Sequence, residues 1–186
     1  MIFQKKRCEI ICVGSVSKDI FFPTDEGIII ETPEDVTSKR KMAFELGGKY
    51  RVADRYEAVG GVAANVAHGL TRLGHQAYCY SKRGNDEVGK WLISEFNREK
   101  VPTTLLFVDK EAKTDLSAII VLTQNGERTI FHNRDANEKL EIIDDKFSAA
   151  KWVFVSALNG SWMENLQKIL ALKEKYGFSL AFNPGQ

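Results

Sequence analysis

The sequence has few cysteines and almost no net charge, and each of these shortages excludes some classes of protein. Its three cysteines, Cys8, Cys12 and Cys79, include no C-x-x-C pair, and any disulfide scheme leaves one of them unpaired. This usage is typical of a reducing compartment and argues against secretion. The formal net charge is +1, which gives no support for binding to nucleic acid or to a membrane surface. We therefore expect a cytoplasmic protein with neither kind of partner.

Long apolar runs, leader sequences and metal motifs are also missing. The basic stretch Met1–Arg7 leads into an apolar run that is too short to span a membrane, and no small-residue cleavage site follows it. His68 and His75 do not have the spacing of metal ligands. We therefore expect no signal peptide, no membrane-spanning segment and no metal site.

Two widespread nucleotide-binding motifs are absent as well. The sequence has no G-x-G-x-x-G fingerprint, and none of its glycine-containing loops ends in G-K-[ST]. The first absence disfavours the dinucleotide-binding domain of an oxidoreductase, and the second excludes a P-loop.

The stretch Gly60–Gly74 carries the clearest local pattern in the chain. Gly60 and Gly61 predict a tight turn that lets a ligand approach the main chain, and a helix follows directly. Asn65 lies one helical turn further on, and Gly74 is the expected C-terminal cap. A diglycine turn, a free helix N-terminus and an amide side chain together suit a hydroxyl-rich or anionic ligand. The apolar residues of the helix recur at helical spacing: Val62, Val66, Leu70 and Leu73.

A second candidate site follows the first predicted strand. Cys8–Val16 is a continuous apolar run, which is typical of a strand buried on both faces of a parallel sheet. Ser17 and Asp19 come after its C-terminal end, the edge at which open α/β sheets bind ligands. Asp19 is therefore a candidate acceptor for ligand hydroxyls.

An inserted flap is predicted between this strand and the first helix. Ile28–Ile30, Met42–Leu46 and Tyr50–Val59 read as short antiparallel strands separated by polar turns, with Thr32–Lys41 as a charged loop. Such a flap, spanning about residues 27–59, would cover the ligand or pair with another subunit.

The rest of the chain alternates between strands and helices, as expected of a three-layer, mostly parallel α/β fold. Asp86 is the expected cap of the second helix, and Asn125-Gly126 predicts a hairpin at 115–133. The chain stops directly after its last strand, so we expect an incomplete fold or a partner that completes it. The remaining predicted segments are strands at Gln76–Lys82, Val101–Val108, Lys151–Ala157 and Phe178–Phe182 and a helix at Ser161–Lys175.

Each polar candidate also has a purely structural interpretation. The diglycine can be a simple loop-to-helix junction, and Asp19 can cap a turn. Arg134, which could bind an acidic ligand group, can equally be an exposed loop residue. A histidine at a strand end such as His132 is more often structural, and the Lys39-Arg40-Lys41 run is more often only solvated.

Read together, these residues resemble the ribokinase-like family, the pfkB carbohydrate kinases. Gly60–Gly74 resembles the first family signature, and Gly84 lies where its final glycine is expected. Gly14–Asp19 resembles the G-S-x-x-x-D segment whose aspartate binds sugar hydroxyls in this family. The inserted strands at 28–59 resemble its sugar-covering lid, which often forms the dimer contact. Asn183–Gly185 resembles the N-P segment near the nucleotide phosphates.

The resemblance covers Cys8–Gln186, but only the N-terminal part of a typical family member. It implies transfer of the γ-phosphoryl group of ATP to a primary hydroxyl of a sugar or nucleoside, with Mg²⁺. The catalytic base of the family is an aspartate in a G-A-G-D motif, and no such motif occurs in this sequence. We therefore expect a single ribokinase-like domain over 1–186 that lacks the C-terminal part of the fold, and we assign no catalytic residue.

The resemblance also implies roles for individual residues. The hydroxyl and carboxylate of Ser17 and Asp19 would accept sugar hydroxyls, and the amide of Asn65 would fix another. The candidate residues on the substrate side are Ser17, Asp19, Gly60, Gly61, Asn65 and Arg134, and the candidate on the nucleotide side is Asn183.

Two functional hypotheses follow. The chain is the substrate-binding part of a sugar or nucleoside kinase that uses ATP and Mg²⁺. Alternatively, it is a non-catalytic sugar-binding or dimerisation module derived from that family, which the missing G-A-G-D motif favours for the chain as it stands. Whether the chain alone is an enzyme stays open between these two hypotheses.

Overall fold

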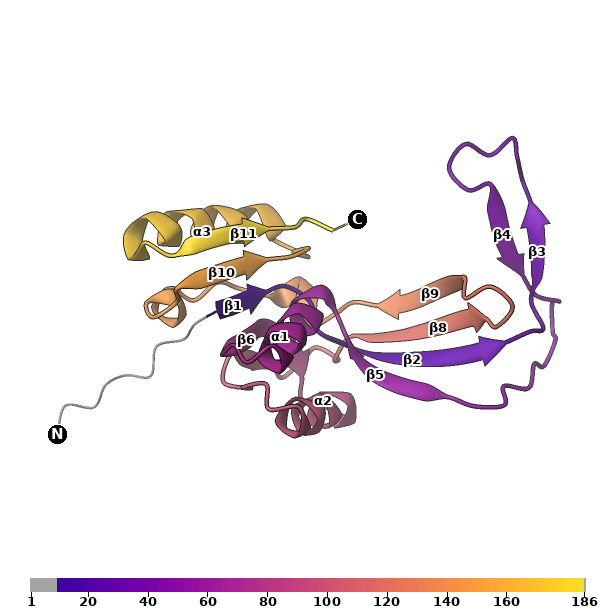
Figure 1. Cartoon of the computed structure of the whole chain (residues 1–186), viewed down its shortest axis with the longest axis horizontal. Helices are drawn as coiled ribbons and strands as arrows, with labels where there is room; N and C mark the ends of the chain where they lie inside the picture. Colours follow the sequence, from indigo (N-terminus) through magenta and orange to yellow (C-terminus); the bar gives the residue numbers. More distant parts are fainter. Residues whose placement is uncertain (1–9, 186) are drawn as a thin grey trace. The chain divides into compact units, whose positions relative to one another are not determined.

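The structure, a computed structural model, describes residues 10–185 and divides them into two compact units. The first unit contains residues 10–18, 59–116 and 133–185, and the second contains 19–58 and 117–132. The basic N-terminal stretch, Cys8 and Gln186 lie outside the described residues. Each unit is described below by itself (Figure 1).

The first unit is built on a five-stranded sheet with the order β11-β10-β1-β6-β7. All four neighbouring pairs of strands are parallel, which confirms the expected parallel sheet. The central strand β1 aligns Cys12 with Cys79 of β6, and both are buried free thiols. The strands are β1 Ile10–Val13, β6 Ala77–Gly84, β7 Leu106–Asp109, β10 Trp152–Val155 and β11 Ser179–Phe182.

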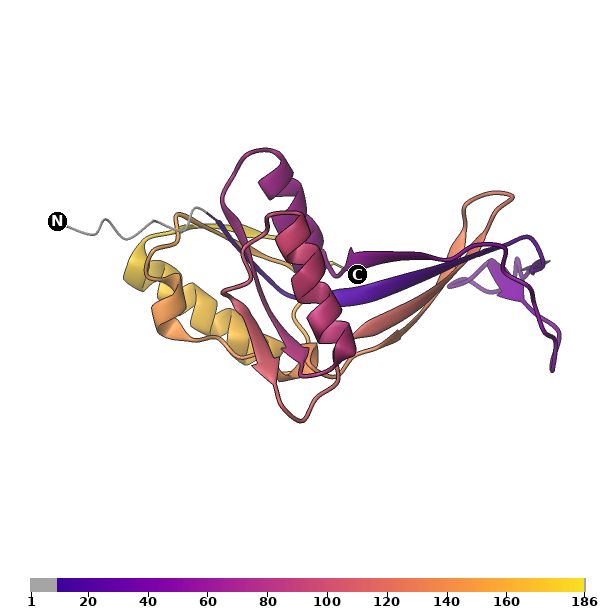
Figure 2. The same cartoon turned by 90° about the horizontal axis from the view of Figure 1, so that it is seen from below.

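Helices cover both faces of this sheet, as the alternation of side chains along β1 requires. Ile11 packs into one apolar cluster with Ile169 of α3, whereas its neighbour Cys12 packs into another with Ala64 of α1. Figure 2 shows α1 and α2 on the near side of the sheet and α3 on the far side. The three-layer arrangement expected from the sequence is therefore present in this unit. The helices are α1 Val62–Arg72, α2 Glu87–Arg98 and α3 Trp162–Tyr176, with short 3-10 helices at Asn137–Lys139 and Asp144–Phe147.

The predicted helix boundaries rest on the expected capping residues. Gly74 has φ +88° and follows the C-cap residue Leu73 of α1, and the next amide, of His75, donates to the carbonyl of Leu70 at 3.0 Å. This is a Schellman ending. Gly177 ends α3 in the left-handed conformation, and Asp86 caps α2 by accepting from the amide of Gly89 at 2.8 Å.

The predicted strand Val101–Val108 is wrong over its first half. Lys100 has φ +61°, and the amide of Val101 donates to the carbonyl of Phe96 at 2.9 Å. Val101 therefore belongs to the ending of α2, and the strand β7 begins only at Leu106.

The second unit consists of strands and loops (Figure 1). A four-stranded sheet has the order β5-β2-β8-β9, and its last two strands form the predicted hairpin. A separate antiparallel ribbon pairs β3 with β4, with Ile28 opposite Ala43. The strands are β2 Ser17–Thr24, β3 Ile28–Glu31, β4 Arg40–Ala43, β5 Tyr56–Gly60, β8 Leu116–Leu122 and β9 Arg128–Asn133.

Three expectations for this region are wrong. The segment after Ser17 is the strand β2 and not merely a strand end, which its polar start and Pro23 conceal in the sequence. The predicted strand Tyr50–Val59 exists only from Tyr56 onward. Tyr50 instead folds back in a loop, where its ring contacts that of Phe44 and its hydroxyl accepts from the amide of Glu45 at 2.6 Å. The expected charged loop ends at Lys39, because β4 begins at Arg40.

None of the helices in residues 10–185 combines the length and the apolar character needed to cross a membrane.

Asp86 makes a testable contribution to stability, because its carboxylate binds two segments at once. It accepts from Gly89, and also from the hydroxyl and the amide of Thr114 at 2.6 and 2.8 Å. Burial raises the pKa of this carboxyl, but these hydrogen bonds outweigh burial, and the net pKa is lowered. We expect Asp86→Ala to lower the free energy of unfolding by about 1–2 kcal/mol at neutral pH.

Because the pKa of Asp86 is lower in the folded state, its contribution is fully present above its unfolded value of about 3.9. It is lost as the pH falls through the folded value, so denaturation curves of wild type and variant should converge in acid. The control is Asp25→Ala, which changes an exposed loop aspartate. A difference that stays constant from pH 7 to pH 2 contradicts the assignment.

Candidate functional site

The candidate site begins where the turn after β1 meets the N-terminus of α1. The hydroxyl of Ser15 accepts from the amide of Val62 at 3.1 Å, and the carbonyl of Ser15 accepts from the amide of Ala64 at 3.4 Å. Ser15 therefore caps α1 from a distant part of the chain, since Gly61 at the N-cap position has no side chain to do so. The helix N-terminus, expected to be free, is partly occupied by this turn.

Gly61 is required by this contact. It has φ +90°, and a Cβ at this position would lie 2.4 Å from the carbonyl oxygen of Ser15 and 2.7 Å from the Cα of Val16. Its missing side chain thus makes room for the chain's own turn. Gly14 is required in the same way, because a Cβ there would lie 1.9 Å from the hydroxyl of the buried Ser156.

Buried polar residues hold the other side of the turn. The amide of Asn137 donates to the carbonyl of Val16 at 2.7 Å and to the carboxylate of Asp115 at 2.7 Å. Its oxygen accepts from the hydroxyl of Ser81 at 2.6 Å. Asp115 also accepts from the amide of Asp135 at 3.0 Å. Asp115 and Asn137 are only 3% and 1% exposed, so these polar side chains form their hydrogen bonds with the protein and almost none with water.

Sequence reasoning missed this cluster. It gave neither Asn137 nor Asp115 a role. One signal was available, since aspartate is depleted from strands and Asp115 stands directly before β8. A carboxylate at that position points to a polar partner from elsewhere in the fold.

Of the predicted substrate-side residues in the first unit, Ser17 and Gly60 adjoin this turn or its contact at Gly61, and Asn65 lies further along α1. Ser17 is half-buried at the start of β2, two residues after Ser15. Gly60 is buried at the end of β5, and Asn65 is exposed in the first turns of α1. Asp19 follows Ser17 along β2 but is assigned to the second unit.

Arg134 and Asn183 lie in two other loops that follow strands. The guanidinium of Arg134 donates to the side-chain oxygen of Asn159 at 3.0 Å; Arg134 is exposed and Asn159 is half-buried. Asn183 follows β11. Its backbone amide donates to the carbonyl of Val155 at 2.9 Å, and its side-chain oxygen accepts from the backbone amide of Gly185 at 3.1 Å. Asn183 thus stabilises the turn that it occupies.

A hollow of about 220 Å³ lies beside Asn183 in the first unit. Its lining is mostly apolar, with one hydroxyl, and half of the surface of Trp162 is exposed. The lining residues are Ser156, Leu158, Trp162, Leu166, Phe182 and Pro184.

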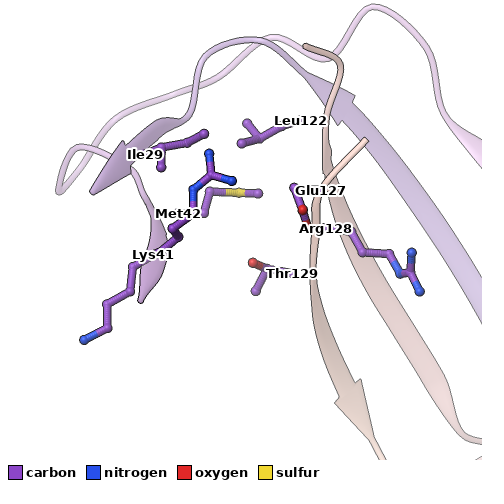
Figure 3. A pocket seen from close by; sticks show the side chains of 8 residues that line it. Ile29, Lys41, Met42, Leu122, Glu127, Arg128 and Thr129 are labelled. Atoms are coloured by element: carbon purple, nitrogen blue, oxygen red, sulfur yellow. The ribbon is translucent and has the colours of Figure 1, made fainter. Parts of the chain in front are cut away.

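A second hollow, of about 160 Å³, lies within the second unit between the β3–β4 ribbon and the β8–β9 turn (Figure 3). Apolar side chains of Ile29, Met42 and Leu122 face it, whereas the ends of Lys41 and Arg128 point away. Lys41 instead pairs with Asp35 at 2.9 Å. Arg40, Glu127 and Thr129 also line this hollow, but it contains none of the predicted site residues and is not part of the candidate site.

The contact between Gly61 and the turn can be tested by substitution. We expect Gly61→Ala to destabilise the protein strongly, because the backbone conformation alone costs roughly 1–3 kcal/mol for an alanine and the clash with Ser15 adds to it. The matched control is Gly69→Ala in the same helix, where a Cβ meets nothing within 4 Å. That variant should gain about 0.5–1 kcal/mol from helix propensity. Equal effects of the two substitutions in thermal denaturation would contradict the geometry.

The sequence is similar to those of known sugar kinases. It is 28% identical over 102 residues to a fructokinase of Salmonella typhimurium, covering 53% of this chain and 33% of the relative. It is 31% identical over 153 residues to a 5-dehydro-2-deoxygluconokinase of Clostridium botulinum, covering 78% of this chain and 38% of the relative. The matched segments thus span well under two thirds of the curated relatives.

The fold is similar to solved structures of the same kind. A ribokinase from Giardia lamblia matches with a TM-score of 0.73 and 18% identity, over 96% of this chain and 52% of that one. A ribokinase from Cryptococcus neoformans in complex with ADP matches with a TM-score of 0.68 and 21% identity, over 95% and 49%. A nucleoside kinase from Burkholderia thailandensis in complex with inosine matches with a TM-score of 0.70 and 16% identity, over 95% and 52%.

These likenesses place the chain in the ribokinase fold, and it spans about half the length of these structures. The family model of the pfkB family carbohydrate kinases matches residues 9–185. The chain therefore belongs to the pfkB family of carbohydrate kinases.

Proposed function

We propose that the chain is the substrate-binding part of an ATP-dependent sugar or nucleoside kinase. The observation that carries this proposal is the contact of the turn after β1 with the start of α1, at Ser15 and Gly61. It brings Ser17 and the backbone at Gly60 and Gly61 into one region at the carboxyl end of a parallel strand, where α/β folds bind ligands.

Specific roles follow for the exposed polar groups. In this proposal Ser17 and Asp19 accept hydroxyls of the substrate, and main-chain amides at Gly60 and Gly61 approach it closely. Asn65 supports the proposal because it is exposed on the first turns of α1, with an amide that can both donate and accept. Arg134 would contact an acidic group of a substrate, once released from Asn159.

The reaction we propose is transfer of the γ-phosphoryl group of ATP to a primary hydroxyl. Asn183 is the group proposed to lie toward the nucleotide phosphates. Among residues 10–185, no three His, Cys, Asp or Glu side chains gather as a metal site, so we assign no Mg²⁺ ligand here. The 186 residues contain no G-A-G-D segment, and we assign no catalytic base.

The second unit supports the proposal of a lid. Residues 27–59 and the hairpin at 115–133 would cover the substrate and form the contact of a homodimer in the cytoplasm. Several large apolar side chains of this unit are exposed, as expected of a surface that is covered in use. They include Ile28, Ile30, Leu46, Tyr56 and Phe131. The same exposure favours the alternative function, a non-catalytic sugar-binding or dimerisation module.

Substrate binding is tested with Asn65→Ala. Isothermal titration of a panel of pentoses, hexoses and nucleosides should show at least one ligand for the wild type. The variant should bind that ligand about tenfold more weakly, the effect of one lost hydrogen bond. Its stability should not fall, because alanine favours an exposed helix position. The matched control is Asn97→Ala on the exposed face of α2. The proposal fails if no member of the panel binds, or if both variants bind as the wild type does.

Turnover separates the two functions. We expect this chain alone to bind its ligand without transferring phosphate from Mg-ATP, because no residue of the sequence matches the catalytic base of the family. The measurement is ADP release in the presence of the ligand found by titration. Measurable turnover would reject the non-catalytic module and would require a base that the present proposal does not contain.

A further inference from the structure

The turn that carries Ser17 is fixed at three residues, all of them in the first unit. Ser15 is held by the first amides of α1. Val16 is held by Asn137, whose amide donates to its carbonyl at 2.7 Å and whose oxygen accepts from its amide at 3.4 Å. The amide of Lys18 donates to the carbonyl of Asp115 at 3.0 Å. Ser17 therefore lies between two anchored peptide groups.

The orientation of the Asn137 amide is itself determined by its neighbours. The hydroxyl of Ser81 donates to its oxygen, which places the NH2 group toward Val16 and the carboxylate of Asp115. A flipped amide would turn its NH2 group toward the peptide N–H of Val16 and its oxygen toward the carboxylate. Both contacts would be repulsive in a site with almost no water.

Asp115 completes the arrangement from the other side. Its carboxylate accepts from the side-chain amide of Asn137, from the amide of Asp135 at 3.0 Å and from the backbone amide of Asn137 at 3.4 Å. Three N–H groups thus compensate the buried carboxylate. The start of β8 and the segment after β9 are thereby bound to each other and to the turn.

We propose that Asn137 is a positioning residue for the substrate site, and that Asp115 orients it. This inference rests on the proposed function, since Asn137 acts by holding Val16 and hence the hydroxyl of Ser17 in the binding geometry. A preorganised turn loses less conformational entropy when the ligand binds than a mobile one, so affinity depends on the residues that fix it.

The test compares two buried asparagines of the same unit. Asn165 is 2% exposed, and its side-chain amide donates to the carbonyl of Leu140 at 2.7 Å. The variant Asn165→Ala therefore loses a similar buried hydrogen bond, but at a residue that does not contact the turn through that bond. We expect Asn137→Ala and Asn165→Ala both to lower the melting temperature. Only Asn137→Ala should raise the amide exchange rates of Val16, Lys18 and Val62, and only this variant should weaken ligand binding, by tenfold or more.

A second, more conservative variant separates a loss of positioning from misfolding of the protein. Asp115→Asn keeps the shape of the side chain but replaces one acceptor oxygen by a donor, so it should produce the same changes in exchange and affinity at a smaller size. Unchanged exchange at Val16 and Lys18 in both variants would overturn the inference, and so would faster exchange with unaltered affinity. If the wild type binds no sugar or nucleoside, the proposed function fails instead, and the failure is visible before any variant is made.

Discussion

The structure of the first unit depends on the close approach of two backbone segments, Ser15–Val16 and Gly61. A side chain at 61 would overlap the carbonyl of Ser15, so the turn after the central strand and the start of α1 can meet only because that side chain is missing. The hydroxyl of Ser15 then satisfies a helix amide that would otherwise need water or a local cap. One steric requirement thus fixes both the strand end and the helix start, the two elements that carry most of the proposed substrate contacts.

On the opposite side of the turn, a polar cluster does what apolar packing cannot do. Apolar contacts tolerate small rotations of a peptide group, whereas the amide of Asn137 specifies the position of both the N–H and the C=O of Val16. Asp115 and Ser81 leave this amide a single satisfied orientation. The cost of burying a carboxylate is offset by three N–H donors, so the cluster contributes order more than net stability.

Sequence reasoning predicted the elements whose signals are local. The apolar runs of β1, β10 and β11 and the caps Gly74 and Asp86 lie where they were expected. It was wrong where the outcome depends on contacts with distant residues. The alternation at Tyr50 reads as a strand, but the ring of Tyr50 packs on Phe44 in a loop. The diglycine was recognised, but its partner Ser15 and the role of Asn137 arise from residues 46 to 121 positions away in the chain, which no local pattern records.

The hydrogen bonds between Asp115 and the segment at 135–137 join the two ends of the β8–β9 hairpin. The chain between these residues is a hairpin whose ends are already held together, and the entropic cost of lengthening its connecting turn grows only slowly with the length of that turn. Residues 123–127 at the tip are exposed, whereas Ser117, Ile119 and Leu122 of β8 are buried, so we expect insertions, deletions and exchanges to be tolerated at the tip rather than along β8. The tip of the hairpin can therefore change in length and sequence while the hydrogen bonds at its base stay the same.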